Sequence, residues 1–184
     1  MKNIFLIVCL LFISLPSMFS QKYFTREGKV VFTSQAPLEK IEAENEKATS
    51  VLDVTSGRME FAILIKAFQF EKALMQEHFN ENYMESSTYP KATFKGQIKQ
   101  VDAVNWSADG TYEVIVTGDI TIHGATKAIE APATITVKDG DISASSTFEL
   151  TVADFEIKIP AVVRDNIAKT VEVTVEVNYE LLKS

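Results

Sequence analysis

The sequence predicts an all-β protein: an extended antiparallel barrel of eight strands with one inserted amphipathic helix. Apolar and polar residues alternate through one segment after another, which is the pattern of strands with one buried and one wet face. Turn sequences such as Asp139-Gly140 separate these segments. A single stretch, residues 72–85, has helical periodicity instead. Successive strands with few crossovers favour an up-and-down barrel, and a two-sheet sandwich is the alternative.

The first residues have the composition of a secretory signal peptide. Lys2 precedes an apolar run over residues 4–13 that is too short to span a bilayer. We therefore expect a signal peptide over residues 1–20 and a single domain over residues 21–184; a short membrane anchor is the alternative. The only cysteine, Cys9, lies in the apolar run, so the mature domain must depend on its core rather than on disulfides.

The charge of the chain limits its partners. It has 25 acidic and 18 basic residues, a formal net charge of −7, and no basic run or stripe. This composition disfavours nucleic acid and anionic membrane surfaces as partners. Together with the signal peptide, it predicts a periplasmic or secreted protein without stable membrane insertion. A homodimer is compatible with the pattern, although no strand face is singled out for it.

The strands are expected along almost the whole mature chain. Residues 58–66 have apolar side chains on both faces, which predicts a strand covered on both sides. Ala108-Asp109-Gly110 is a second hairpin signal beside Asp139-Gly140. The predicted strands are residues 29–35, 39–47, 58–66 and 92–101, the long pair that meets at His123-Gly124, and residues 141–151 and 171–181.

The helix is expected over residues 72–85. Met75, Phe79 and Tyr83 recur every four residues and form an apolar face, with Leu74 beside them. The helix must end before Tyr89-Pro90, because proline cannot continue it. Such a helix either covers one mouth of the barrel as a lid or fills that end as part of the core.

Small residues occupy inward positions on two neighbouring strands. Gly118, Ala131 and Ala133 stand where bulky side chains are expected. Replacing a leucine by alanine in a sealed core costs roughly 2–5 kcal/mol, so several small inward residues favour a hollow interior with a ligand. The alternative is that these residues lie opposite aromatic rings where the barrel tapers.

Catalytic candidates are few. The chain has two histidines, His78 and His123, and neither is accompanied by further ligands at metal spacing. Motifs for a serine nucleophile, a zinc protease or a phosphate loop are not present. We therefore predict no enzyme activity, no metal and no cofactor apart from a bound ligand.

Two longer motifs add a family resemblance. The first runs from Glu77-His78-Phe79-Asn80 to Tyr89-Pro90-Lys91-Ala92-Thr93-Phe94, with the pattern H-F…Y/F-P…F. The second is Gly118-Asp119-Ile120-Thr121-Ile122-His123-Gly124-Ala125-Thr126-Lys127, close to G-D-L-T-I-x-G-x-T-K. In this order, and with Phe148 and Asp154-Phe155 after them, the motifs resemble the YceI-like family of exported lipid- or polyisoprenoid-binding proteins.

The resemblance implies a lipocalin-like barrel whose tunnel holds a long apolar chain, such as a polyisoprenoid, an isoprenoid quinone or a fatty-acid-like molecule. We expect Gly96 and Gly118 to give this chain clearance, and His78 or Tyr89 to orient its head group. No catalytic residue is implied. The residues predicted to contact the ligand are Phe61, Ile63, Met75, His78, Phe79, Tyr89, Phe94, Tyr112, Val116, Ala133, Ile135, Ala144 and Phe148.

The sequence therefore predicts a periplasmic or secreted carrier of a long-chain lipid. Two other functions stay open at this point. One is a lipid-modifying enzyme, which is suggested only by His78 near the expected pocket. The other is a structural or stress-protective barrel whose interior is filled by its own side chains.

Overall fold

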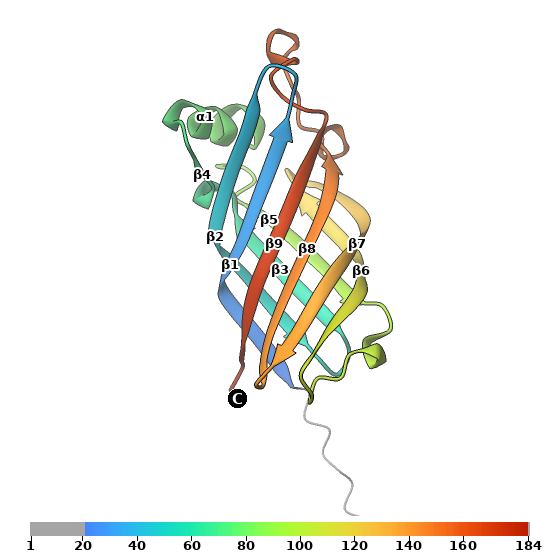
Figure 1. The fold of residues 1–184 in the computed structure, drawn as a ribbon. Helices are drawn as coiled ribbons and strands as arrows, with labels where there is room; N and C mark the ends of the chain where they lie inside the picture. Colours follow the sequence, from blue (N-terminus) through green and yellow to red (C-terminus); the bar gives the residue numbers. More distant parts are fainter. Residues whose placement is uncertain (1–20, 184) are drawn as a thin grey trace, which may run out of the picture.

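A computed structural model describes residues 21–183 and shows a closed antiparallel barrel of eight strands (Figure 1). A two-residue ninth strand and one short helix complete the fold. The predicted closed barrel is confirmed, and the alternative of a two-sheet sandwich is wrong. The predicted signal peptide, residues 1–20, lies outside the described residues. Within residues 21–183, no helix is both long enough and apolar enough to cross a membrane.

Strand pairing runs around the barrel in the order β1-β9-β8-β7-β6-β5-β3-β2, and a β1–β2 pairing closes the ring. Closure pairs the edges that an open sheet would expose. The strand β4 (Gln69–Phe70) pairs with the part of β2 beyond the end of β3. The barrel strands are β1 (Lys22–Gln35), β2 (Lys40–Asp53), β3 (Arg58–Leu64), β5 (Lys91–Ile98), β6 (Gly110–Ile122), β7 (Ala125–Lys138), β8 (Asp141–Thr151) and β9 (Thr170–Leu181).

Short helical turns connect the strands. Among the described residues they are η1 (Ile65–Ala67), α1 (Ala73–His78), the π-helical turn η2 (Phe79–Tyr83), η3 (Val101–Ala103), η4 (Val152–Phe155) and η5 (Ala161–Val163). The helix α1, the β1–β2 turn and the segment 152–169 lie at one end of the barrel, which we call the open end (Figure 1). The β7–β8 turn and the C-terminus lie at the other, which we call the closed end (Figure 1).

The first hairpin is much longer than the sequence pattern indicated. The strands predicted over residues 29–35 and 39–47 extend to Lys22 at one end and to Asp53 at the other. Register shifts on both sides of Gly28 interrupt the alternation by which a strand is recognised in a sequence.

Asn45 of β2 lies between the parts of this strand that pair with β3 and with β4. It is fully buried at the level where the β3 pairing has ended and the β4 pairing begins. Its side-chain amide donates to the carbonyl of Leu64 at 2.9 Å, and its carbonyl oxygen accepts from the backbone N–H of Lys47 at 2.8 Å. The asparagine thus satisfies backbone groups that the interrupted ladder leaves without partners.

Two tight turns confirm the long hairpins. Ile122 pairs with Ala125 and Lys138 with Asp141, so the turns consist of His123-Gly124 and Asp139-Gly140 alone. The φ angles are +50° and +80° in the first turn and +54° and +87° in the second. Positive φ at both central residues is what a type I′ hairpin turn requires.

The hairpin signal at Ala108-Asp109-Gly110 is wrong as a tight turn. The strands β5 and β6 are joined by an eleven-residue connection, residues 99–109, that includes η3. The carboxylate of Asp109 accepts a hydrogen bond from the backbone N–H of Asp139 at 2.9 Å. This residue therefore ties the long connection to the neighbouring turn at the closed end.

The helical segment is shorter and more exposed than predicted. The α-helix ends at His78 and the chain continues as the wider π turn to Tyr83. No residue of α1 or η2 is fully buried, so the segment covers the rim of the barrel and does not plug it. Leu74, expected beside the apolar face, is 61 % exposed. Leu64 of β3 is 46 % exposed, so the second face of that strand is not covered.

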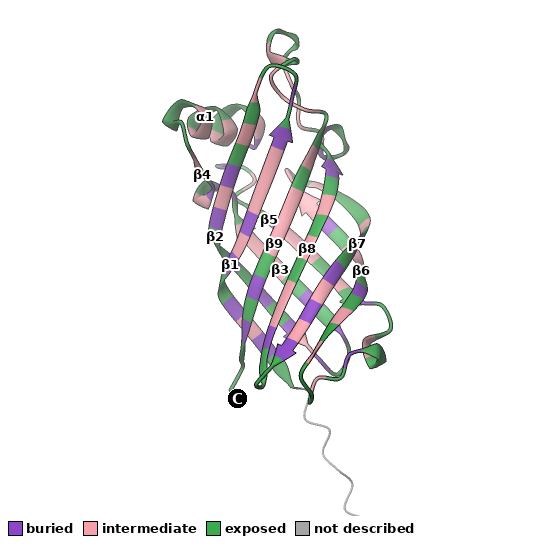
Figure 2. Ribbon diagram, viewed as in Figure 1, coloured by how far each residue is buried: buried purple, intermediate pink, exposed green. Residues whose placement is uncertain are grey.

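The core fills the closed end of the barrel. Covered and exposed positions alternate along the strands (Figure 2), and the covered ones converge here into one cluster. Leu52 and Ile135 are 1 % exposed, and Trp106 from the 99–109 connection packs against the cluster. Large side chains therefore occupy the interior of this half.

Gly96 and Gly118 have a different role from the one expected. They are paired across β5 and β6, where a Cβ on Gly118 would meet the Lys95 carbonyl oxygen and lie 2.8 Å from Phe94 Cζ. The Phe94 ring already covers both glycines. These glycines therefore allow β5 and β6 to lie close together and leave room for the Phe94 ring. They do not provide space for a ligand.

Gly118→Ala is expected to lower the free energy of unfolding by about 1–3 kcal/mol, because the new methyl group would have to displace backbone atoms of β5. Urea denaturation monitored by circular dichroism measures the change. Lys95→Ala, on the exposed face of the paired strand, is the control and should change stability by less than about 0.5 kcal/mol. Unchanged stability in Gly118→Ala would contradict this packing.

Candidate functional site

The half of the barrel toward the open end is hollow. An inner cavity of about 170 Å³ lies between the strands, and an outer cavity of about 330 Å³ lies at the open end. The two cavities adjoin, because six side chains line both of them. These are Phe32, Phe79, Met84, Ile122, Leu150 and Val173.

The inner cavity is bounded by small residues on adjacent strands. Ala131 and Ala133 of β7 line it together with Ala144 and Ser146 of β8. The remaining lining is almost entirely aliphatic and aromatic. The interior space that the small inward residues predict is therefore present, and its walls are suited to an apolar molecule.

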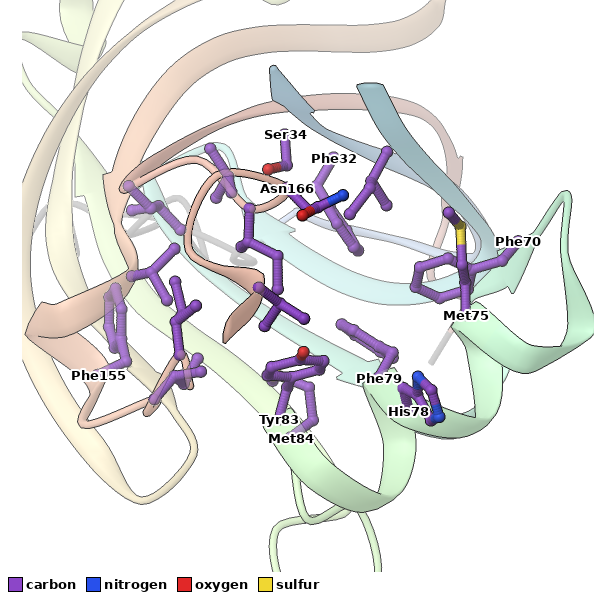
Figure 3. A pocket seen from close by; sticks show the side chains of 18 of the residues that line it. Phe32, Ser34, Phe70, Met75, His78, Phe79, Tyr83, Met84, Phe155 and Asn166 are labelled. Carbon is purple, nitrogen blue, oxygen red and sulfur yellow. The ribbon is translucent and has the colours of Figure 1, made fainter. Parts of the chain in front are cut away.

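The structure brings most of the predicted contact residues to this space. Phe79 lines both cavities, and Met75 and His78 line the outer one (Figure 3). The predicted residues that line the inner cavity are Phe61, Ile63, Phe94, Val116, Ala133, Ile135, Ala144 and Phe148.

Tyr89 and Tyr112 are not brought to the cavity. The Tyr89 ring packs on His123 with 4.5 Å between ring centroids, beside the β6–β7 turn. Tyr112 lies toward the closed end, packs against the core cluster there and donates a hydrogen bond to the Asn105 carbonyl at 3.4 Å. Both tyrosines therefore pack outside the cavity. This packing explains why Tyr89 stands in the motif and why Tyr112 has an inward position on its strand.

An aromatic cluster at the junction of the two cavities was not identified from the sequence. The Phe79 ring stacks on Phe32 with centroids 5.4 Å apart and meets Phe70 at 4.9 Å and Phe68 at 5.7 Å. Phe32 lies in the irregular first hairpin, and Phe68 and Phe70 lie in the short elements after β3. Periodicity does not reveal such residues, because the elements that carry them are irregular or only a few residues long.

A second group of cavity-lining residues, which periodicity did not reveal, comes from the segment after β8. Ile157, Ile159, Val163 and Ile167 line the outer cavity from the side opposite α1. The segment contains two 3₁₀ turns, η4 and η5, and otherwise lacks regular structure. The only sequence signal for it is the unusual density of apolar residues between Ile157 and Val163.

Polar groups gather at the outer cavity. Ser34 accepts a hydrogen bond from the backbone N–H of Ala168 at 2.9 Å. The carboxylate of Glu39 lies 3.3 Å from Lys72 Nζ and accepts from the Asn166 amide at 3.4 Å. Figure 3 shows Ser34 and Asn166 across the space from Met75 and His78. The cavity is thus polar at its mouth and apolar inside.

A hydrogen-bonded pair lies at the inner end. The hydroxyl groups of Tyr179 and Ser50 are 2.8 Å apart and buried, and Tyr179 lines the inner cavity. Burial raises the pKa of Tyr179 to about 12, against the opposing effect of its hydrogen bond with Ser50. Tyr179 also belongs to the core cluster, so the pair lies where the cavity borders the filled closed end.

The site offers little for catalysis. Across residues 21–183, no group of three or more His, Cys, Asp or Glu side chains is placed to hold a metal ion. His78 is exposed at the outer cavity. His123 lies outside both cavities, with Nδ1 3.1 Å from the Phe155 carbonyl oxygen and Nε2 3.6 Å from the Glu85 carboxylate. It connects the β6–β7 turn to η4.

A closed antiparallel barrel with an apolar cavity open at one end is the architecture of proteins that enclose a single small ligand. Within that class, the chain belongs to the YceI-like family, because the family model described as a YceI-like domain matches residues 23–179. No curated protein matches the chain.

Solved structures share this fold at low sequence identity. A polyisoprenoid binding domain from Saccharophagus degradans aligns with a TM-score of 0.76 and 14 % identity over 88 % of this chain and 98 % of its own. BcnA of Burkholderia cenocepacia aligns with a TM-score of 0.67 and 18 % identity over 83 % and 96 %. The YceI protein of Campylobacter jejuni gives 0.56 and 18 % over 77 % and 85 %.

Tyr179→Phe tests the buried pair. At neutral pH the variant should be less stable by about 1–2 kcal/mol, because Ser50 loses its buried partner. The pKa of Tyr179 is higher in the folded protein than in the unfolded chain. Its contribution to stability is therefore full below pH ~10 and is lost as the pH rises from about 10 to about 12.

Urea denaturation at a series of alkaline pH values measures this effect. The stability difference between wild type and Tyr179→Phe should narrow and then reverse over the same interval, changing by about 2–3 kcal/mol for a full shift of this size. A difference that stays constant up to pH ~12 would show that Tyr179 ionises as readily in the folded protein as in the unfolded chain.

Proposed function

We propose that this protein binds a long-chain apolar lipid inside the barrel and carries it through an aqueous compartment, either the periplasm or the extracellular medium. The observation that carries the proposal is the pair of adjoining apolar cavities between the open end and the Tyr179–Ser50 pair. Membership of the YceI-like family supports it, as does the likeness to a structure named as a polyisoprenoid binding domain. The predicted signal peptide supports the compartment.

The polarity of the cavity favours one orientation of the ligand. The tail lies inward against the alanines and phenylalanines of the inner cavity, and the head group lies at the mouth near Ser34, Asn166 and His78. Each methylene removed from water contributes about 0.8 kcal/mol, so ten buried methylenes correspond to about 8 kcal/mol before the costs of binding. Tail burial supplies most of the affinity under this proposal, and the mouth supplies orientation.

A binding role accounts for the side chains of the cavity better than catalysis does. His78 is the single histidine at the cavity, and its imidazole ring has no hydrogen-bond partner among residues 21–183. A general base normally has a partner that orients its ring. The open space likewise disfavours a purely structural barrel, since the lining residues leave contacts unmade when the cavity is empty.

The direct test is extraction of the ligand. Protein purified from its native host, extracted with organic solvent and analysed by mass spectrometry, should release an apolar molecule in near-stoichiometric amount. Protein that is consistently empty and also fails to take up an added polyprenol or long-chain fatty acid would contradict the proposal.

Ala133→Phe should reduce uptake of a long-chain polyprenol by about tenfold or more, because the new ring would occupy the inner cavity. The measurement is retention of radiolabelled polyprenol after gel filtration. Ala128→Phe is the matched control, because Ala128 is exposed on the same strand, β7. Equal uptake by both variants would show that the inner cavity does not hold the tail.

A further inference from the structure

Three exposed apolar side chains surround the open end of the barrel. Val162 is 89 % exposed, Leu38 is 72 % exposed and Leu74 is 61 % exposed. No other large apolar side chain within residues 21–183 exceeds 46 %. Single exposed apolar residues are ordinary on protein surfaces, but here the three most exposed ones share one end of the molecule. We call these three residues the mouth rim.

The mouth rim comes from three segments that are tied together. Leu38 lies in the β1–β2 turn, Leu74 in α1 and Val162 in η5 (Figure 1). Glu39 joins all three segments, because its carboxylate contacts Lys72 just before α1 and Asn166 just after η5. The rim is therefore one surface held around the outer cavity.

The residues beside Val162 favour a lipid surface as the occupant of the rim. The exposed run Pro160-Ala161-Val162 has Lys158 before it and Arg164 after it, and both cations are exposed. An apolar tip between basic residues matches the boundary of a bilayer, where the tip enters the acyl region and the cations lie among the phosphates. Glu156 and Asp165 lie in the same segment, so its charge is mixed.

The charge of the whole chain shows which force dominates. With a net charge of −7, the protein gains little from long-range attraction to anionic lipid. Insertion of the apolar tip must supply most of the binding, with Lys158 and Arg164 acting locally on phosphates. The contact is therefore peripheral and reversible.

We propose that the mouth rim docks on a phospholipid bilayer, with Val162 inserted and the outer cavity facing the lipid. The outer cavity is lined by the sequence neighbours of the rim residues, Glu39, Met75 and Val163, so a chain that leaves the membrane there enters the barrel without crossing water. This inference rests on the proposed function, because it supplies the route by which the barrel exchanges its lipid.

Co-sedimentation with vesicles of phosphatidylcholine, with phosphatidylglycerol as a minor component, tests the docking. Val162→Asp should weaken binding by about tenfold, because a carboxylate replaces the inserted side chain. Leu182→Asp carries the same charge change at an exposed leucine near the C-terminus, at the closed end, and should bind as the wild type does. The exposure of Val162 means that its replacement removes no packing from the fold.

Fluorescence places the contact. The only tryptophan, Trp106, packs at the closed end and should neither shift nor be quenched when vesicles with brominated acyl chains are added. Val162→Trp adds a second tryptophan at the rim, whose emission should shift to the blue and be quenched. Quenching of Trp106 in the wild type would overturn the proposed orientation.

Two further outcomes overturn the docking. The first is vesicle binding of Val162→Asp equal to that of the wild type. The second is a wild-type dimer that dissociates when Val162→Asp is introduced, as seen in sedimentation analysis, because the rim would then bind a second copy of this chain.

The ligand content of the same samples separates this inference from the proposed function. Lipid-loaded protein without rim-dependent vesicle binding contradicts docking alone. Empty protein with rim-dependent vesicle binding contradicts the carrier role alone.

Discussion

The size of the inward-facing side chains decides what each half of this barrel does. At the closed end, leucine, isoleucine and tyrosine side chains meet across the interior and exclude any guest. Toward the open end, the same strands β7 and β8 carry alanine and serine inward, and the space that these residues leave is the inner cavity. A single run of strands therefore provides both a packed core for stability and an apolar chamber, and the Tyr179–Ser50 pair lies where one becomes the other.

The arrangement at the mouth depends on this division. A ligand whose tail is held by a uniform apolar wall needs a place where its polar end can stay hydrated, and the polar groups of the outer cavity provide it. The Glu39 carboxylate holds three segments around that opening, and the aromatic cluster centred on Phe79 lies where the outer and inner cavities meet. The helical segment thus acts at the rim, where small rearrangements can admit a chain without unfolding the barrel.

Regular alternation made most of the fold predictable from the sequence. The strands β6 to β9 and the turns at His123-Gly124 and Asp139-Gly140 follow directly from period-2 patterns and type I′ turn residues. The first hairpin was only half recognised, because the bulges at Gly28 shift the alternation. The inner cavity was predictable for a related reason: small residues at inward positions are visible as soon as the alternation is known. The glycines were misjudged, because sequence does not show that the Phe94 ring lies over them.

The outer cavity was harder to predict, since its residues come from irregular segments that meet only in three dimensions. Ile157 and Asn166 have no periodic pattern around them. Phe32 and Phe79 are far apart in the sequence, so local sequence patterns do not predict their contact.

The most direct test of the central claim is a diffraction structure of the protein purified from its native host. Continuous elongated electron density from the inner cavity to the mouth would agree with a bound chain, whereas an interior that is collapsed or occupied by ordered water alone would contradict it.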